Sequence, residues 1–434
     1  MAEHRPAPPT VWARYYTLGV LTLVYMVNFI DRQILSVLQE PIRLEMGFSD
    51  EQLGLLTGTA FAIFYISAGI PIARWADAGN RRNIIALAVG TWSLMTALQG
   101  MVSSYAQLFA VRIGVGVGEA GGTPPAYSMM SDLFGPQERG RAFAIYATGV
   151  TSGVFCSYLF GSWLSDTFGW RTVFLAIGLP GVAMALLVRF TLKEPVRGYY
   201  EEPTVAEQGA VNPLPPIRDV LALLWSRKSF RHLSLAAALH AFVSYGIGAF
   251  LVSCYVRSFQ IGADNLSRVA IPLGITIGVG GAIGNFAGGA LADYLGKRDR
   301  RWYLWVCGLS TLIAIPFAFA TFLVEDFHVS LALYFIPLVL GYMYGGPTLA
   351  MAHGIVSPRM RALTTSIFLF IINLVGLGVG PWAVGRISDA LHPRYGEESL
   401  RYAILILFSV YVWSAFHYFW GARYIRDDLL RAPT

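Results

Sequence analysis

Runs of about twenty predominantly apolar residues recur along the whole chain, and they constrain its fold more than any other feature. Each run is long enough to cross a hydrocarbon core as a helix at ~1.5 Å rise per residue. Because 55% of the 434 residues are hydrophobic and only 13% are charged, the composition excludes an ordinary soluble domain. We therefore expect an all-α integral membrane protein with twelve transmembrane helices, at about 15–38, 53–72, 84–101, 106–134, 142–163, 173–192, 233–256, 269–291, 302–323, 331–356, 362–384 and 402–424.

The basic residues are distributed unevenly between the two sides of the predicted spans. Most of the 32 Lys and Arg fall in the N-terminal tail, the even-numbered connections and the C-terminal tail. The positive-inside rule then predicts a multi-pass protein of the cell (inner or plasma) membrane with both termini in the cytoplasm. The formal net charge of +6 reflects this topology, so we expect membrane lipids and no nucleic acid as partners.

The chain divides into two halves that repeat each other. Pro, Glu and Gly accumulate in the middle, which predicts an N-terminal six-helix bundle (1–192), a cytoplasmic linker (193–232) and a C-terminal six-helix bundle (233–434). After the second span the chain carries Asp77, Arg81 and Arg82, and after the eighth it carries Asp293, Lys297 and Arg298. A second repeat places Pro136–Arg139 after span four and Pro358–Arg361 after span ten.

The repeated loops resemble the signature of the major facilitator superfamily, in which a glycine is followed by an aspartate and then by a basic pair. The first copy departs from it at Ala73 and Ala78; further similarity lies in Arg112-x-x-x-Gly116, Gly376-x-x-x-Gly380-Pro381 and Gly169-Trp170-Arg171. The resemblance implies two pseudo-symmetric six-helix bundles that work by alternating access. An aspartate at a helix end can hold an arginine or a helix N-terminus in one state and release it in another, so we expect the six loop residues to gate the conformational change. The alternative is that they are topology signals only.

Four ionisable residues fall inside spans of the first half and away from the span ends: Asp31, Arg32, Arg112 and Glu119. Each costs about 2.5–3.5 kcal/mol in the membrane on insertion scales, so each needs a partner or a function. Helical geometry places Glu119 near the midplane, where Arg32 can reach it while Asp31 faces Arg112. A carboxylate paired with an arginine suits proton coupling, because protonation frees the arginine. The alternative is a static salt-bridge network that fixes helix register.

Several motifs of the first half resemble the Spinster family: Asn28–Arg32, Gly116–Ala120, Pro124–Ser128, Arg139–Ala142, Gly169–Arg171 and Glu194–Gly198. Spinster-type carriers are lipid transporters associated with sphingosine 1-phosphate and lysophospholipids. A bacterial member would resemble them in fold and in proton-switch residues. The resemblance thus implies a proton-coupled transporter of an amphipathic lipid.

Polar residues scattered through the spans are candidates for the lining of a midplane cavity: Asn28, Tyr127, His240, Ser244, Tyr245, Asn285, Tyr344, His353 and Asn373. For His240 and His353 the competing interpretation is a hydrogen-bonded packing residue. Cys156, Cys254 and Cys307 have no metal-ligand spacing, so we expect no metal site and no cofactor.

Three other functions compete with lipid transport. A carrier of a small organic anion would use Arg32 and Arg112 as clamps for a carboxylate or phosphate. A membrane enzyme would need a catalytic set, and neither a Ser-His-Asp set nor a nucleotide loop is present in the sequence. A channel would not need repeated gating loops. We therefore expect a transporter that is no enzyme, is coupled to protons and is a monomer.

Overall fold

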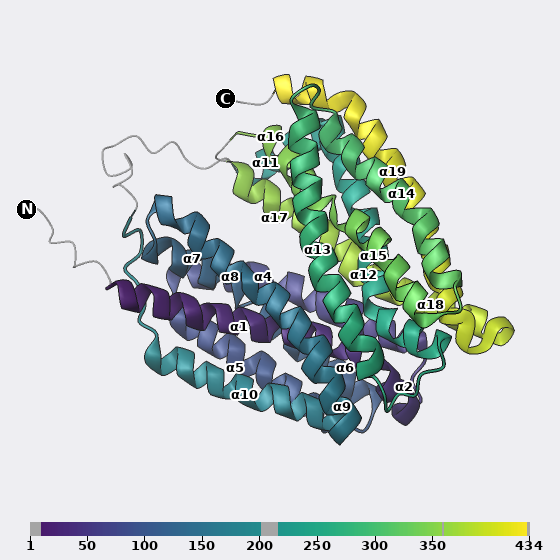
Figure 1. Cartoon of the computed structure of the whole chain (residues 1–434). Coiled ribbons are helices and arrows are strands. Elements are labelled where there is room, and N and C mark those ends of the chain that lie inside the picture. The colour runs from purple at the N-terminus through teal and green to yellow at the C-terminus, as the bar shows by residue number, and fades with distance from the viewer. Residues whose placement is uncertain (1–9, 201–215, 358–359, 432–434) are drawn as a thin grey trace, which may run out of the picture. The chain divides into compact units, whose positions relative to one another are not determined.

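The computed structural model describes residues 10–200, 216–357 and 360–431, and every regular element in these ranges is a helix (Figure 1). The all-α prediction is confirmed. Nine helical segments of the described residues are long and apolar enough to cross a membrane. The predicted spans 84–101 and 106–134 fall on helices outside these nine, and the last two predicted spans lie in one continuous helical stretch, 363–430.

The first compact unit comprises residues 1–35 and 64–212. Helix α5 packs against α10 and α6 in this unit, and polar side chains cap the helix starts, as when Asn80 accepts from the backbone N–H of Asn83 at 3.0 Å. The close approach of α10 to α5 requires a glycine at position 178, because a Cβ on Gly178 would collide with the backbone of Ala97. Its elements are α1 (Val11–Val37), most of α4 (Ala60–Ala78), α5 (Arg81–Gln99), α6 (Tyr105–Glu119), α7 (Thr123–Leu133), α8 (Pro136–Cys156), η2 (Ser157–Gly161), α9 (Ser162–Phe168) and α10 (Trp170–Thr191).

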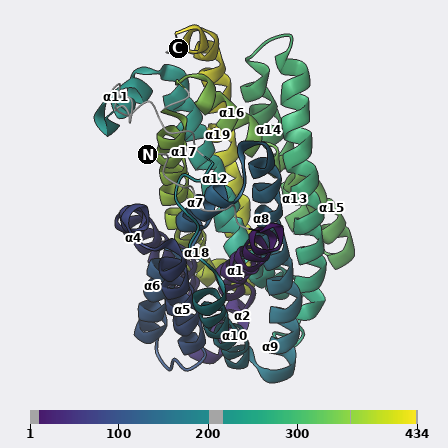
Figure 2. The same ribbon diagram turned by 90° about the vertical axis from the view of Figure 1, so that its left-hand side faces the viewer.

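The second compact unit comprises residues 36–63 and 213–434. Its long helices run alongside one another (Figures 1 and 2), and α12 and α14 both pack against α19 around a buried core that includes Leu233, Tyr418 and Ile425. Its elements are α2 (Gln39–Met46), α3 (Asp50–Gly54), η1 (Leu55–Thr59), α11 (Ile217–Ser226), α12 (Lys228–Ser258), α13 (Ser267–Gly296), α14 (Trp302–Leu323), α15 (Phe327–Tyr342), α16 (Gly345–Gly354), α17 (Arg361–Ile372), η5 (Asn373–Leu377), α18 (Gly378–Tyr395), η6 (Gly396–Glu398) and α19 (Ser399–Leu430).

The two units differ from the sequence-based division in one segment. Residues 36–63 precede the predicted boundary at 193–232, yet they cluster with the second unit. Gly54 explains this, because it packs so closely on the backbone of Pro381 that a Cβ would not fit. Of the predicted linker, residues 201–215 lie outside the described residues, and helix α11 occupies 217–226.

Two of the predicted spans are broken helices. The span predicted at 106–134 stops at Glu119 and resumes at Thr123, and the span predicted at 331–356 stops at Tyr342 and resumes at Gly345. Both breaks coincide with a glycine pair followed by proline, in Gly121-Gly122-Thr123-Pro124 and in Gly345-Gly346-Pro347. Proline has no N–H for the helical ladder, and glycine tolerates the irregular turn. The internal repeat therefore extends to the position of the breaks.

Candidate functional site

An ion pair between α1 and α6 occupies the interior of the first unit. The Nε atom of Arg32 donates to Oε2 of Glu119 at 2.6 Å, the contact that helical geometry predicts. The Glu119 side chain is fully buried, whereas the Arg32 side chain is 22% exposed. Glu119 is also the last residue of α6, so the carboxylate lies at the helix break. Irregular backbone at membrane depth is tolerated where it is buried in protein or lines a cavity.

The other two intramembrane charges, Asp31 and Arg112, lie close enough to attract each other, as expected, but no hydrogen bond from the described residues reaches the Asp31 carboxylate. Arg112 of α6 donates to the backbone carbonyl oxygens of Asp31 and Arg32, at 3.3 and 3.4 Å. The carboxylate of Asp31 is buried, and neither of its oxygens accepts a hydrogen bond from the described residues. Its polar neighbours are Thr96 and Trp92 of α5. All four charged residues lie close together, as the sequence predicts. The hydrogen bonds of Arg112, however, go to backbone carbonyl oxygens of α1, because a carbonyl oxygen that already accepts a helical hydrogen bond has a second lone pair.

Aromatic side chains extend from the Arg32 side of the ion pair along α1. The Arg32 guanidinium lies over the ring of Tyr65 at 4.6 Å and over that of Phe29 at 5.3 Å. Phe29 contacts Tyr25 edge to face, and the Tyr25 ring stacks on Tyr146 at 4.3 Å. The row continues to the predicted cavity residue Tyr127, while the predicted Asn28 is buried next to Glu119. The partly exposed Arg32 at one end and the aromatic rings along the row, of which the Tyr146 ring is buried, give this group of side chains an amphipathic character.

In the second unit the structure brings His240, Ser244 and Tyr344 into one cluster. The His240 ring bonds the carbonyl of Gly341 through Nε2 at 2.8 Å and Thr311 through Nδ1 at 3.2 Å. It packs between the rings of Tyr344 and Tyr411, and Tyr411 in turn bonds Ser244 at 3.2 Å. His240 is completely buried, so its contacts in this conformation are those of a packing residue.

The remaining cavity candidates of the second unit are His353, Asn373, Tyr245 and Asn285, of which Tyr245 lies near Tyr344 and Asn285 lies beside Gly345. His353 bonds Thr365 of α17 at 2.6 Å, and Asn373 begins the π-helical turn η5. Tyr245 and Asn285 are exposed on α12 and α13. Their role as cavity residues stays a prediction.

The repeated loop of the first unit makes its contacts through Arg81. This buried side chain forms ion pairs with Asp132 of α7 and with Glu194 at 2.7 Å, and it donates to Ser128 at 2.8 Å. The backbone N–H of Arg82 donates to the same Glu194 at 2.9 Å. Asp77 is exposed, and its carboxylate has no ion pair or hydrogen bond among the described residues, so the expected contact of Asp77 with a basic group is not formed in this conformation.

The repeated loop of the second unit, which contains Asp293, Lys297 and Arg298, makes its polar contacts through its acids rather than through an arginine. Asp293 accepts a hydrogen bond from the Tyr303 hydroxyl at 2.7 Å, and the side chains of Lys297 and Arg298 are exposed. Asp299, which the sequence reasoning missed, bonds Arg301 and Arg426 at 2.9 Å each. Partial desolvation raises the pKa of Asp299, but the hydrogen bonds from these two residues outweigh it and hold the pKa below its usual range. The second half of the Pro136–Arg139 repeat begins at Pro358 and Arg359, which lie outside the described residues.

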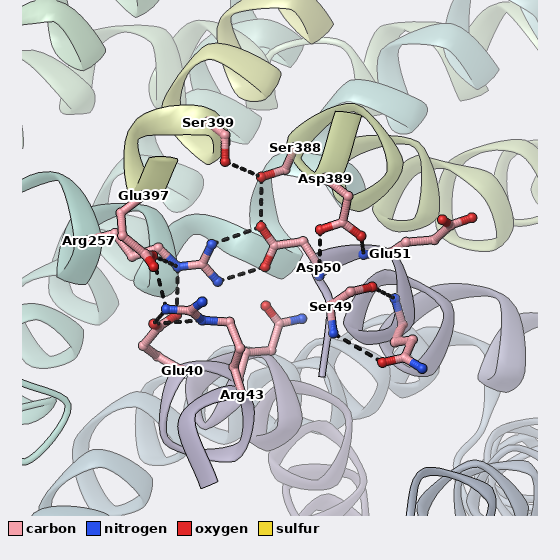
Figure 3. Close-up of polar contacts among 12 residues, drawn as sticks. Glu40, Arg43, Ser49, Asp50, Glu51, Arg257, Ser388, Asp389, Glu397 and Ser399 are labelled. Atoms are coloured by element: carbon pink, nitrogen blue, oxygen red, sulfur yellow. Dashed lines mark hydrogen bonds and ion pairs between the residues drawn. The ribbon is translucent and has the colours of Figure 1, made fainter. Parts of the chain in front are cut away.

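A dense group of ion pairs in the second unit was also missed (Figure 3). Arg257 near the end of α12 contacts both Asp50 and Glu40, and all three side chains are buried. Asp50 and Glu40 belong to the connection between the first two predicted spans, where the sequence shows no repeat and no motif. The one available signal was the accumulation of acids there.

The profile of the family described as Major Facilitator Superfamily matches residues 21–381. The chain belongs to this superfamily. A solved structure of a bacterial homologue of the human lysosomal transporter Spinster, inward-facing and unoccupied, is 34% identical to it. It superposes with a TM-score of 0.88, over 97% of this chain and 99% of the other.

Two sequence relatives of this superfamily member are similar over nearly their full lengths. An MFS-type efflux pump of Mycolicibacterium smegmatis is 32% identical to this chain, and the match covers 99% of this chain and 96% of the pump. A probable L-galactonate transporter of Escherichia coli is 27% identical, and that match covers 98% of this chain and 94% of the transporter. These matches confirm a multi-pass membrane transporter, rather than an enzyme, with a Spinster-like sequence and fold. The fold of the superfamily has twelve spans, three more than the nine segments that qualify by length and apolarity. Helix α5 is one of the three, the α6–α7 pair is the second, and the third arises because the stretch 363–430 contains two spans.

Proposed function

We propose that this transporter works by alternating access and couples protons to the movement of an amphipathic lipid with an anionic head group, such as a sphingosine 1-phosphate-like molecule or a lysophospholipid. The observation that carries the proposal is the Arg32–Glu119 ion pair at the break between α6 and α7. A buried ion pair at an irregular point of a membrane helix suits a switch better than a structural brace, because a brace needs no break.

Coupling follows from the competition for one arginine. An ionised Glu119 holds Arg32, whereas a protonated Glu119 releases it to an anionic head group or to Asp31. Proton binding and anion binding are then linked, and each changes which conformation is favoured. Asp31 supports this scheme, because its buried carboxylate has no hydrogen bond of its own among the described residues.

The row of Phe29, Tyr25, Tyr146 and Tyr127 favours an amphipathic substrate over a small anion. An anionic head group would bind Arg32, and an acyl or sphingoid chain would lie along the rings. A small organic anion would use the arginine alone and leave the aromatic row without a function. The name of the L-galactonate relative favours this second substrate class, which the experiment therefore includes.

For the architecture we propose that 1–192 and 233–434 are the two moving bundles, joined by the linker at 193–232, in a monomer with both termini in the cytoplasm. The gating role of Asp77, Arg81, Arg82, Asp293, Lys297 and Arg298 belongs to the same proposal. Protease accessibility of tags at the two ends, in sealed inverted and right-side-out vesicles, tests the topology.

The main experiment has two steps. Purified protein is first screened for thermal stabilisation by lysophospholipids, sphingoid phosphates and sugar acids. The stabilising compound is then followed in proteoliposomes with and without a pH gradient, for the wild type and for Glu119→Gln. We expect stabilisation by the lipids and gradient-driven transport that the variant loses. Stabilisation by sugar acids alone would replace the lipid with the organic anion, and an unchanged gradient response in Glu119→Gln would overturn the coupling.

A further inference from the structure

An open polar hollow lies at one end of the second unit, where two connections between helices meet. It is bounded by the turn that follows α12, by the start of α13 and by the short connection between α14 and α15. Its volume is about 390 Å³, which is in the range of binding sites for small molecules. Neither the Arg32–Glu119 pair nor any residue of the repeated loops lines it, so the proposed transport function does not account for this hollow.

The hollow lies at the level where the apolar spans end. The predicted spans of α12 and α14 end at about 256 and 323, and that of α13 begins at about 269. The lining residues fall just outside these limits, at 259–262, 265, 268 and 325–327. Because the hydrocarbon core covers only the apolar runs, residues directly beyond them lie among the lipid head groups. In the proposed topology these are the head groups of the outer leaflet.

The side of the hollow that faces α12 and α15 carries aromatic rings. Phe259 and Phe327 both line the hollow, and their ring centroids lie 5.6 Å apart with an interplanar angle of 85°. Tyr255, one turn earlier in α12, contacts Phe327 edge to face. These rings offer apolar area to the glycerol end of a lipid and leave the rest of the rim to polar groups.

The rim carries charges of both signs. Arg268 of α13 and Glu325 of the α14–α15 connection line the hollow and are exposed, and neither side chain forms an ion pair or hydrogen bond with the described residues. Asp326 also lines it, but its carboxylate caps α15 by accepting from the backbone N–H of Val329 at 2.8 Å. One guanidinium and one carboxylate are therefore available to a bound molecule.

Gln260, which also lines the hollow, has a backbone conformation that favours glycine. Its φ is +52°, and among the described residues no other non-glycine residue has a positive φ. Its backbone N–H donates to the carbonyl of Arg257 at 3.2 Å, and that of Ile261 donates to the carbonyl of Val256 at 2.9 Å. This is a Schellman helix end, in which glycine is the usual residue at this position. A glutamine there costs stability, which indicates a use for its side chain.

We propose that the hollow binds the head group of phosphatidylethanolamine, as a lipid held at the membrane interface and not as the transported substrate. Arg268 binds the phosphate, and the side-chain amides of Gln260 and Asn265 are additional donors. Glu325 accepts from the ammonium group. Ethanolamine is preferred to choline, because an ammonium group donates hydrogen bonds to a carboxylate and a quaternary amine does not.

Protection of a cysteine in the hollow tests its location. The native Cys156, Cys254 and Cys307 are replaced by alanine, and Ile261→Cys then reports the hollow without removing a proposed contact. Ala263→Cys is the matched control, because this residue is as half-buried as Ile261 but does not line the hollow. In nanodiscs of phosphatidylcholine, added phosphatidylethanolamine should slow the reaction of Ile261→Cys with a water-soluble maleimide several-fold and leave Ala263→Cys unchanged. Equal rates for Ile261→Cys with and without phosphatidylethanolamine would overturn the site.

Gln260→Gly separates a binding role of the side chain from a structural one. Glycine relieves the backbone strain, so we expect a higher melting temperature than that of the wild type in phosphatidylcholine. The same variant should lose the further rise that phosphatidylethanolamine gives the wild type. A lower melting temperature in both lipids, or an unchanged response to phosphatidylethanolamine, would overturn the assignment of Gln260.

The two charges are tested by the amount of phosphatidylethanolamine that half-protects Ile261→Cys. Arg268→Gln and Glu325→Gln should each raise this amount about 1.5–5-fold, the range that exposed charge pairs contribute. Arg394→Gln is the control, because Arg394 is an exposed arginine near the end of α18 that does not line the hollow. An equal effect of Arg394→Gln and Arg268→Gln would overturn the role of the charges.

Two further comparisons identify the ligand. Protection should survive in Arg32→Ala, because Arg32 belongs to the first unit and does not line the hollow. Loss of protection in that variant would assign the effect to the transport site and overturn a separate lipid site, whereas survival supports it whatever the carrier transports. Free phosphoethanolamine should protect poorly, because it has no acyl chains to hold it at the interface. Protection by phosphoethanolamine equal to that by the lipid would make the hollow a site for soluble zwitterions and overturn the lipid assignment.

Discussion

The Nε atom of Arg32 lies 2.6 Å from Oε2 of Glu119, and Glu119 is the residue at which α6 ends. A carboxylate that can take a proton is therefore placed where the helix has already been interrupted. Changing its charge perturbs a local break and not the middle of a continuous hydrogen-bonded ladder.

Replacing Glu119 with glutamine should abolish the response of transport to a pH gradient while the protein remains folded. Glutamine mimics the protonated acid, so Arg32 is released at every pH. Transport in proteoliposomes at several external pH values measures this. Glu138→Gln is the control, because Glu138 also pairs with an arginine, Arg14, but is half exposed. An equal loss of pH response in both variants would mean that the effect is not specific to the α6 break.

Arg32→Ala should impair transport more than Asp31→Asn, because the alanine variant leaves Glu119 buried without its partner. Breaking a buried ion pair costs about 3–5 kcal/mol, and the partial exposure of Arg32 places the expected loss at the lower end. Arg32→Lys keeps the charge but loses the planar stacking on Tyr65 and Phe29. We expect the lysine variant to retain pH response with a raised KM, and a KM equal to that of the wild type would show that the stacking does not contribute to binding.

Asp31→Asn should reduce transport without lowering thermal stability. The Asp31 carboxylate is buried and receives no hydrogen bond from the described residues, so neutralising it removes a desolvation cost. The contrasting variant is Asp132→Asn, whose acid forms an ion pair with the buried Arg81 and should lower the melting temperature. A lower melting temperature for Asp31→Asn, together with an unchanged one for Asp132→Asn, would mean that Asp31 stabilises the fold and Asp132 does not, contrary to this prediction.

Asp77→Asn should change the balance of conformations by about 1–3 kcal/mol while leaving this conformation intact, because the Asp77 carboxylate makes no ion pair among the described residues. Any contact it makes would belong to another state. Cysteine accessibility on both sides of the membrane reports the balance, and Asp219→Asn, which changes an exposed acid of α11 between two spans, serves as the control. Unchanged accessibility in Asp77→Asn would leave the first repeated loop as a topology signal.

Gly178→Ala should destabilise the first unit by about 1–3 kcal/mol, because its Cβ would collide with the backbone of Ala97 in α5. Thermal unfolding of the purified protein measures the loss. Gly19→Ala is the matched control, since no atom lies within 4 Å of an added Cβ there. Similar melting of the two variants would show that α5 and α10 separate easily.

The predictable features of this chain were those that repeat or follow a helical period. Apolar run length gave the all-helical fold, and the pitch of α1 and α6 brought Arg32 to Glu119. The break after Glu119 was also readable, from the glycine pair and Pro124, but the long apolar run made one continuous helix the simpler interpretation. The partner of Arg112 was not readable, because backbone carbonyls have no sequence signature.

The Arg257 cluster shows the limit of such reasoning. Arg257 and Asp50 are 207 positions apart, and Asp50 lies in a short connection with no period that would fix its direction. Charge complementarity alone would have allowed many other partners for each acid. The close packing of Gly54 on Pro381 and of Gly385 on Asp50 helps to bring these side chains together, and close packing of backbones is a property of the folded chain.

The interruption of the fourth predicted span also bears on how the chain enters a bilayer. Neither α5 nor the α6–α7 pair is among the nine helices that qualify by length and apolarity. A segment that carries Arg112 and Glu119, both buried in the folded protein, would partition poorly into lipid by itself. We expect it to wait at the insertion machinery until α1, with Arg32 and its carbonyl oxygens, is present to receive it. Biogenesis would then proceed by groups of helices, and substitutions at Arg32 would reduce the amount of inserted protein as well as its activity.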